Sequence, residues 1–137
     1  MKHKILIVTA HYYKNISKNL VNDAKLTLHK SKFKYEIIDV PGVFEIPIII
    51  AKNIKKYDAF IALGCVIKGE TPHFDFISKA SIEAIMKLSV ESKKPIGNGI
   101  LTCMDIDQAN VRSDPKGQKR KGMEAAVAVL SVLGFKT

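Results

Sequence analysis

The stretch DAFIALGCVIKGETPHFDFI, residues 58–77, decides the fold because it joins a strand to a helix through a single loop. Residues 58–64 are almost all apolar, which is typical of a buried strand in a parallel sheet. Apolar and small residues then recur at helical spacing, at Phe74, Ile77, Ser81, Ala84, Ile85 and Leu88. We therefore expect a strand over 58–64, a loop from Cys65 to His73, and a helix after it.

The loop has the composition of an anion site. In open α/β sheets, ligands gather where strands end, because the next helix presents unpaired N–H groups and its positive dipole end there. Lys68 supplies a charge, Gly69 allows close backbone approach, and Thr71 donates a hydrogen bond. A helix N-terminus disfavours an imidazolium, so His73 is placed to accept and return a proton. The alternative is a helix-capping loop with a surface histidine.

The remaining chain repeats the order of strand and helix. Further strands are expected over 4–10, 34–40 and 96–102, and further helices near 45–55, 105–111 and 121–133. Another helix follows the first strand, with Ser17 as a candidate N-cap and a stripe of Ile16, Leu20, Ala24 and Leu28. This alternation predicts an α/β fold, a three-layer α/β/α sandwich with a central four-stranded parallel sheet, in one domain over 1–137.

Three local patterns add detail. Ile48 to Ile50 follow one another, so the second helix should be covered on more than one side. In Gly97-Asn98-Gly99 the glycines favour a bulge or close approach of a ligand, and Asn98 is expected to be a buried carboxamide that needs partners. The helix over 121–133 is apolar all round, which indicates a subunit interface or, alternatively, a deeply buried core helix.

Length and composition narrow the class of protein. The 137 residues, 47% hydrophobic and 26% charged, suit one globular domain without a membrane-spanning run. The N-terminus enters a strand at once and lacks a cleavage site, so we expect no signal peptide and a cytoplasmic protein. Cys65 and Cys103 lack metal-site spacing, and we expect two buried thiols and no metal.

The net charge of +9 raises the question of an anionic partner. Only Arg112 and Arg120 are arginines, and the lysines are dispersed without interleaved aromatics, so we expect neither nucleic-acid nor membrane binding. One stretch, residues 112–121, concentrates basic groups around a single acid and is suited to a phosphate.

The predicted strand ends bring a constellation to one edge of the sheet. Tyr12 follows the first strand, Val43-Phe44-Glu45 follow the second, the loop from Cys65 follows the third, and Asn98 lies on the fourth. An aromatic face, a carboxylate, a carboxamide and backbone amides suit a planar heterocycle rich in donors and acceptors.

These residues resemble the 6,7-dimethyl-8-ribityllumazine synthase family. The resemblance depends on PGVFEIP at 41–47, GCVIKGETPHFD at 64–75, PIGNGILT at 95–102 and KGMEAA at 121–126, and it covers almost the whole chain. It implies a flavodoxin-like fold and the condensation of 5-amino-6-(D-ribitylamino)uracil with 3,4-dihydroxy-2-butanone 4-phosphate. It implies these two small-molecule substrates and no metal or organic cofactor.

The resemblance also implies roles for particular residues. His73 matches the proton-transfer histidine, and Tyr12 the aromatic that stacks on the pyrimidine. The remaining substrate-binding matches are Val43, Phe44 and Glu45 for the ribityl chain and ring edge, Cys65, Val66 and Ile67 for backbone contacts, and Glu70 and Thr71 for the phosphate loop. From a neighbouring subunit come Asn98, Arg112 for the phosphate, and Lys121 close to that site.

The sequence departs from the family pattern in two places. Ala10-His11-Tyr12-Tyr13 replaces the commoner Arg-Phe-Asn or Arg-Trp-Asn, which leaves Tyr12 and Tyr13 as alternatives for the stack. The segment between Arg112 and Lys121 is a residue longer than in many relatives. The family assembles as a pentamer or a shell of twelve pentamers, and the short N-terminus favours a free pentamer.

Other functions remain as alternatives at this point. A riboflavin synthase of the archaeal type would share the fold but dismutate two lumazines. A carrier would bind flavin or lumazine without turnover. A nucleic-acid-binding protein would show duplex affinity that falls steeply with salt.

Overall fold

A computed structural model describes residues 4–135. Four parallel strands form one sheet in the order β2-β1-β3-β4. Their bounds are β1 Lys4–Ala10, β2 Lys34–Val40, β3 Ala59–Ile67 and β4 Ile96–Cys103. The expectation about a signal peptide falls partly on residues 1–3, which lie outside the described residues.

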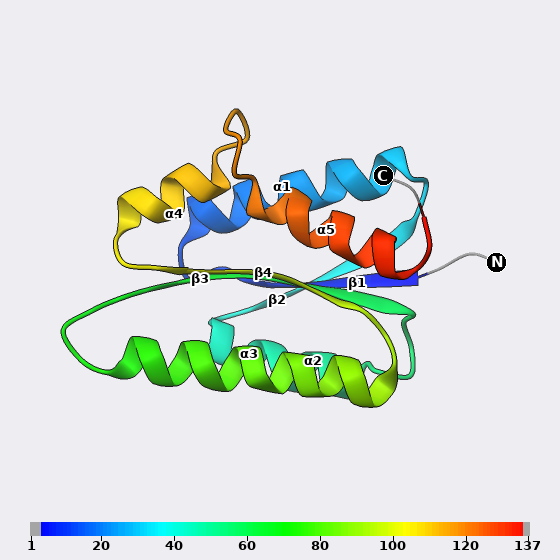
Figure 1. Ribbon diagram of the computed structural model, residues 1–137, viewed down its shortest axis with the longest axis horizontal. Helices are drawn as coiled ribbons and strands as arrows, with labels where there is room; N and C mark the ends of the chain where they lie inside the picture. The colour runs from blue at the N-terminus through cyan, green and yellow to red at the C-terminus, as the bar shows by residue number, and fades with distance from the viewer. Residues whose placement is uncertain (1–3, 136–137) are drawn as a thin grey trace.

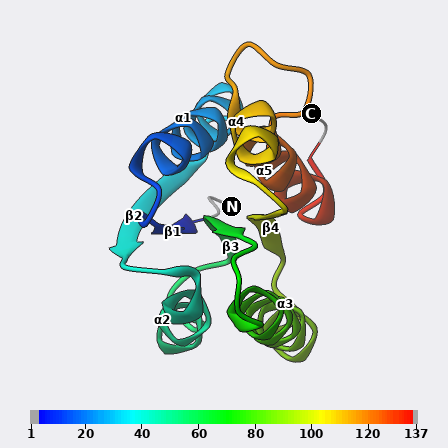
Figure 2. The same ribbon diagram turned by 90° about the vertical axis from the view of Figure 1, so that its left-hand side faces the viewer.

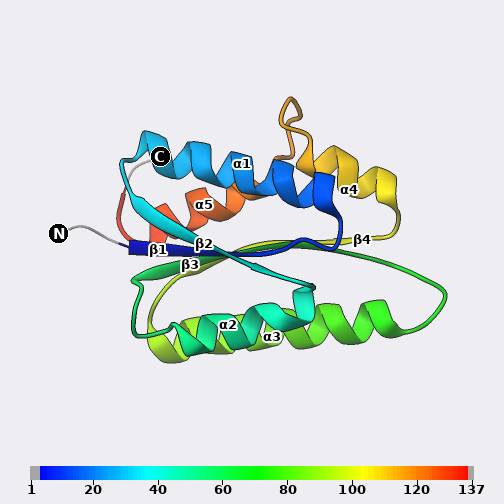
Figure 3. The same cartoon turned by 180° about the vertical axis from the view of Figure 1, so that it is seen from behind.

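Helices cover both faces of this sheet. Their bounds are α1 Lys14–Lys30, a 3₁₀ turn η1 Val43–Glu45, α2 Ile46–Lys52, α3 His73–Ser92, α4 Ile106–Ser113 and α5 Lys121–Val132. Helices α1, α4 and α5 lie on one face, and α2 and α3 on the other (Figures 1 and 3). Seen from the end, the three layers are distinct, and the predicted α/β/α sandwich is confirmed (Figure 2).

The core is divided by the sheet into two apolar clusters. The predicted α1 stripe of Ile16, Leu20, Ala24 and Leu28 is buried against the sheet and α5. On the other face, Val43, Ile46 and Ile50 pack with Leu6, Val8 and Phe60. Strand β3 lies in the middle and is buried over nearly its whole length, as its continuous apolar sequence predicts.

Several local expectations were wrong. Strand β3 continues through Ile67 because Cys65, Val66 and Ile67 pair with Leu101, Thr102 and Cys103 of β4, so these residues are not loop. Ser17 is not the N-cap of α1, because the helix begins at Lys14 and the Ser17 hydroxyl donates to the Ala10 carbonyl at 2.5 Å.

The described chain also bears on two expectations about helix packing. Ile48 on α2 is 58% exposed, so this chain alone does not cover the helix on more than one side. Helix α5 buries Gly122, Ala125, Ala126, Val129 and Leu130 within the chain. Its apolar sequence is therefore largely explained by packing against α1 and β4, although Val132 is exposed.

Within residues 4–135, none of the helices combines the length and the apolar character needed to cross a membrane.

Candidate functional site

A cleft of about 540 Å³ opens where β1 and β3 end. It brings together residues from four segments that the sequence analysis selected: Tyr12, Val43, Phe44, Glu45, Cys65, Val66, Ile67 and His73. Tyr13, Gly42 and Ile77 complete the lining. This is the edge at which parallel sheets of this kind bind ligands.

Aromatic rings form one wall of the cleft. Tyr12 is 74% exposed and Phe44 is 61% exposed, so both rings offer free faces. Tyr13 is half-buried against the core and meets the Tyr12 ring edge-on, with centroids 4.9 Å apart and planes at 78°. Burial raises the pKa of the Tyr13 phenol. The Tyr12 ring is thus the more exposed of the two, and Tyr13 contacts it edge-on.

The end of β3 gives the cleft a row of backbone groups. Strand β1 pairs with β3 only as far as Leu63, whereas β4 pairs with β3 as far as Ile67. Along Cys65 to Ile67, the edge that faces away from β4 therefore has no strand partner among the described residues. Such an edge can hydrogen-bond a flat ring with alternating donors and acceptors.

The Cys65 side chain contributes a neutral group. It is 6% exposed, and burial, with the Cys103 thiol next to it, raises the pKa of Cys65 to about 12. Both cysteines are free and buried, which confirms the expectation of two buried thiols. Since only a thiolate is a strong nucleophile, the raised pKa disfavours a nucleophilic role for the Cys65 side chain.

The turn before α3 sets the position of His73. The His73 amide donates to the Thr71 hydroxyl at 3.4 Å, and the helix begins at His73. The His73 side chain lines the cleft together with Phe44 and Glu45. Glu70 and Thr71 are exposed and lie outside the lining of this cleft.

Glu45 is held by the turn at the end of β2. The 3₁₀ turn brings the Glu45 amide to the Gly42 carbonyl at 3.1 Å. A Cβ atom on Gly42 would lie 3.2 Å from the Glu45 Oε1 atom, so the carboxylate is folded back over the glycine. This places a carboxylate beside the aromatic wall.

The basic residues lie in a second cavity, of about 450 Å³, between β4 and the start of α5. Arg112, Lys119 and Lys121 line it, together with Glu124 and residues 100–102. The Arg112 Nη1 atom is 3.9 Å from the Cys103 Sγ atom. Arg112 and Lys121 therefore share a cavity, but within one chain it is not the cavity that His73 lines.

Asn98 corrects a prediction. Its side chain is exposed and accepts a hydrogen bond from the Ile100 amide at 3.0 Å, so it is not a buried carboxamide. The glycines beside it make room for close packing, against α5 at Gly97 and against β3 at Gly99. A Cβ atom on Gly97 would lie 2.3 Å from the Ala125 carbonyl oxygen, and one on Gly99 2.4 Å from Leu63.

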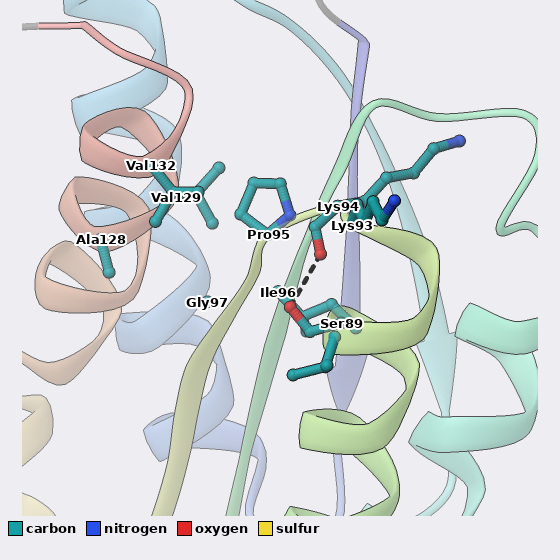
Figure 4. A pocket seen from close by; sticks show the side chains of 10 residues that line it. Ser89, Lys93, Lys94, Pro95, Ile96, Gly97, Ala128, Val129 and Val132 are labelled. Atoms are coloured by element: carbon teal, nitrogen blue, oxygen red, sulfur yellow. Dashed lines mark hydrogen bonds between the residues drawn. The ribbon is translucent and has the colours of Figure 1, made fainter.

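A further groove lies at the opposite end of the sheet, where β4 begins (Figure 4). Its lining is mostly aliphatic and includes Pro95, Ile96, Val129 and Val132, and the Ser89 hydroxyl donates to the Lys94 carbonyl at 2.8 Å. None of the predicted site residues lines it.

Sequence reasoning missed two side-chain contacts of this part of the molecule. Tyr13 was considered only as a substitute for Tyr12, although it supports that ring. Asp23 was not considered at all, yet it is 1% exposed and holds Arg120 through two hydrogen bonds. The available signal was an acidic residue between Leu20 and Ala24 on the apolar stripe of α1, which needs a buried partner.

The side chains described between Lys4 and Phe135 include no group of three or more His, Cys, Asp or Glu that could hold a metal ion.

Comparison with known proteins identifies the family of this chain. Residues 2–137 match the family model for 6,7-dimethyl-8-ribityllumazine synthase. The protein of that name from Bartonella bacilliformis is 45% identical over 136 residues, which cover 96% of this chain and 89% of the relative. The one from Novosphingobium aromaticivorans is 44% identical, with 97% and 96% covered, and the one from Zymomonas mobilis is 42% identical with the same coverage. The chain belongs to the 6,7-dimethyl-8-ribityllumazine synthase family.

Proposed function

We propose that this protein is a transferase that condenses 5-amino-6-(D-ribitylamino)uracil with 3,4-dihydroxy-2-butanone 4-phosphate. The product is 6,7-dimethyl-8-ribityllumazine, the penultimate compound of riboflavin biosynthesis, and phosphate and water are released. One observation carries the proposal: in a chain of this family, an aromatic wall, a carboxylate, an unpaired strand edge and His73 line the same cleft.

The cleft suggests how the uracil is held. Tyr12 stacks on the pyrimidine ring, and the backbone of Cys65, Val66 and Ile67 bonds the ring edge. Val43, Phe44 and Glu45 hold the ribityl chain, with the Glu45 carboxylate as a hydrogen-bond acceptor for hydroxyl groups. A bound pyrimidine would thus have its reactive amine fixed before the second substrate reacts.

The chemistry then needs orientation and proton transfer. The 5-amino group attacks the ketone carbonyl, and loss of water gives an imine. Phosphate leaves by elimination, and after rearrangement the ribitylamino nitrogen closes the second ring with loss of water. His73, at the mouth of the cleft, accepts and returns protons in these steps.

For the phosphate we propose a composite site. Glu70 and Thr71 form the loop at one side, and Arg112, Lys121 and Asn98 come from a neighbouring subunit. Two facts support this arrangement. Arg112 and His73 line different cavities of one chain, and Phe44 and Ile48 beside the cleft are apolar and exposed.

We propose a homo-oligomer, most simply a pentamer, with active sites between subunits. The two free thiols fit a reducing compartment, and we place the protein in the cytoplasm. No sequence pattern indicates nucleic-acid or membrane binding, and we propose neither.

A phosphate-release assay tests the function. The purified protein should release phosphate only when both substrates are present, and absorbance of the lumazine should rise in step with phosphate. Phosphate release without lumazine, or no turnover at all, would contradict the proposal. Riboflavin formed from lumazine alone would instead identify a riboflavin synthase.

A further inference from the structure

An ion pair between the partly exposed Arg120 and the buried Asp23 joins the start of α5 to α1. The Arg120 Nη2 atom is 2.7 Å from Asp23 Oδ1, and Arg120 Nε is 3.3 Å from Asp23 Oδ2. Asp23 is 1% exposed, so its carboxylate depends on this partner. The two residues are 97 positions apart in the sequence, and the pair fixes the loop that precedes α5 to the body of the protein.

This anchor decides which basic residues of the loop reach the second cavity. Arg120 has an extended backbone, with φ −91° and ψ 92°, and consecutive side chains of an extended segment point to opposite sides. Arg120 points to Asp23, and its neighbours Lys119 and Lys121 line the cavity with Arg112. Lys116, in the same loop, is exposed and outside the lining.

The cavity is built for an anion. Three basic side chains and one carboxylate, Glu124, line it. The first turn of α5 borders it, and none of the described side chains caps that helix N-terminus, so backbone N–H groups are available for an anion.

We propose that Lys119 is a further phosphate-binding residue and that the Asp23–Arg120 ion pair is the positioning device that holds it at the cavity. The proposal rests on the proposed function, because the anion is the phosphate of the four-carbon substrate. It goes beyond the residues that the family resemblance supplies, since Lys119 and Arg120 lie in the part of the chain that departs from the family pattern.

The test compares Lys119→Ala with Lys116→Ala, which remove the same charge from the same loop. A charge-assisted hydrogen bond to phosphate predicts that Lys119→Ala raises KM for the phosphorylated ketone about tenfold, with KM for the uracil unchanged. Lys116→Ala should change both constants by less than about twofold, as expected of a surface substitution. Equal effects of the two substitutions, or none, would overturn the role of Lys119.

The positioning role needs variants that fold. Removing Arg120 alone would leave the buried Asp23 carboxylate without this partner, whereas replacing both residues with apolar ones is often neutral for stability. The double variant Asp23→Leu/Arg120→Leu should therefore fold, and it should raise KM for the phosphorylated ketone without raising KM for the uracil. The single variant Arg120→Lys keeps a positive charge next to Asp23, so its KM for the phosphorylated ketone should lie between those of the wild type and the double variant. An unchanged ketone KM in the folded double variant would overturn the positioning role.

A binding measurement separates this inference from the function. Inorganic phosphate should raise the Tm of the wild-type protein, and Lys119→Ala should weaken that shift while Lys116→Ala retains it. This readout needs no turnover. A wild-type protein that releases no phosphate from the substrates but shows the Lys119-dependent shift would refute the proposed function and keep the anion site. Turnover with equal phosphate shifts in both variants would refute the inference alone.

Discussion

We propose that His73 transfers protons in the reaction, and its removal gives the first prediction. Its imidazole lines the cleft and is exposed, so His73→Ala should leave the free energy of unfolding unchanged. Turnover should fall by about ten- to a thousandfold, the range for loss of a positioned acid–base group. His29→Ala, on the exposed end of α1, is the matched control and should keep full activity. Steady-state phosphate release would measure both, and unchanged turnover in His73→Ala would refute its role.

Cys65 gives a prediction about stability and pH. Its pKa rises from 9.0 to about 12 on folding because burial, with the neighbouring Cys103, disfavours the thiolate. The neutral thiol is therefore favoured by the folded state. This preference adds to the free energy of unfolding. The added stability is fully present below pH 9 and is lost as pH rises towards 12, by roughly 1 kcal/mol per unit of pH.

Comparison with Cys65→Ala isolates this contribution. Tyr57 also has a raised pKa, but its causes do not involve Cys65, so it acts equally in both proteins. The pKa of Tyr13 is raised mainly by burial, and the smaller part that comes from the Cys65 thiolate is lost together with Cys65. Urea unfolding at pH 8 and pH 10.5 should show a steeper loss of stability in the wild type. Parallel losses in the two proteins would contradict the prediction.

At the scale of elements, the contact between α1 and α5 is the most sensitive to volume. A Cβ atom on Gly122 would lie 2.2 Å from the Leu20 carbonyl oxygen, which is backbone and cannot move aside. Gly122→Ala should therefore destabilise the protein by at least about 2 kcal/mol, although alanine favours helix. Thermal or urea unfolding measures the change.

Gly69→Ala is the control for that substitution. Nothing lies within 4 Å of the Cβ position on Gly69, and the residue is in an exposed loop. Its unfolding free energy should differ from wild type by less than about 0.5 kcal/mol. A Gly122→Ala protein as stable as this control would show that α5 is not packed as described.

The elements show what a sequence can and cannot predict. The bounds of β1 and β2 matched, because continuous apolar runs between breaks are a local signal. The end of β3 was predicted three residues too early, because the last three residues are strand only through their pairing with β4. The sequence marks Gly97 and Gly99 as unusual, but only the packing shows why no side chain fits: α5 lies against Gly97, and Leu63 of β3 lies against Gly99.

The candidate site divides in the same way. Tyr12, Phe44, Glu45 and His73 were predictable, because they follow strands that end at one edge of a parallel sheet. The ion-pair partner of Asp23 could not be predicted, because no local sequence pattern links α1 to a residue 97 positions away.

For the whole molecule, the separation of the two cavities leads to a prediction about how subunits share an active site. One chain places His73 and Tyr12 in one cavity and Arg112 in another. If the active site is shared between subunits, Tyr12→Ala and Arg112→Ala each inactivate every site of their own oligomers. Mixed oligomers regain a site wherever an intact Tyr12 faces an intact Arg112.

The extent of this rescue can be calculated. With equal amounts of the two chains and random exchange, a site is intact when its Tyr12 comes from the Arg112→Ala chain and its Arg112 from the other. Roughly one quarter of the sites in a ring meet that condition, so activity should return to about a quarter of wild type. Mixing Tyr12→Ala with the double variant Tyr12→Ala/Arg112→Ala should restore nothing, because no chain then supplies Tyr12. Mass spectrometry of the mixed oligomers would verify exchange, and exchange without rescue would mean that each site is built within one chain.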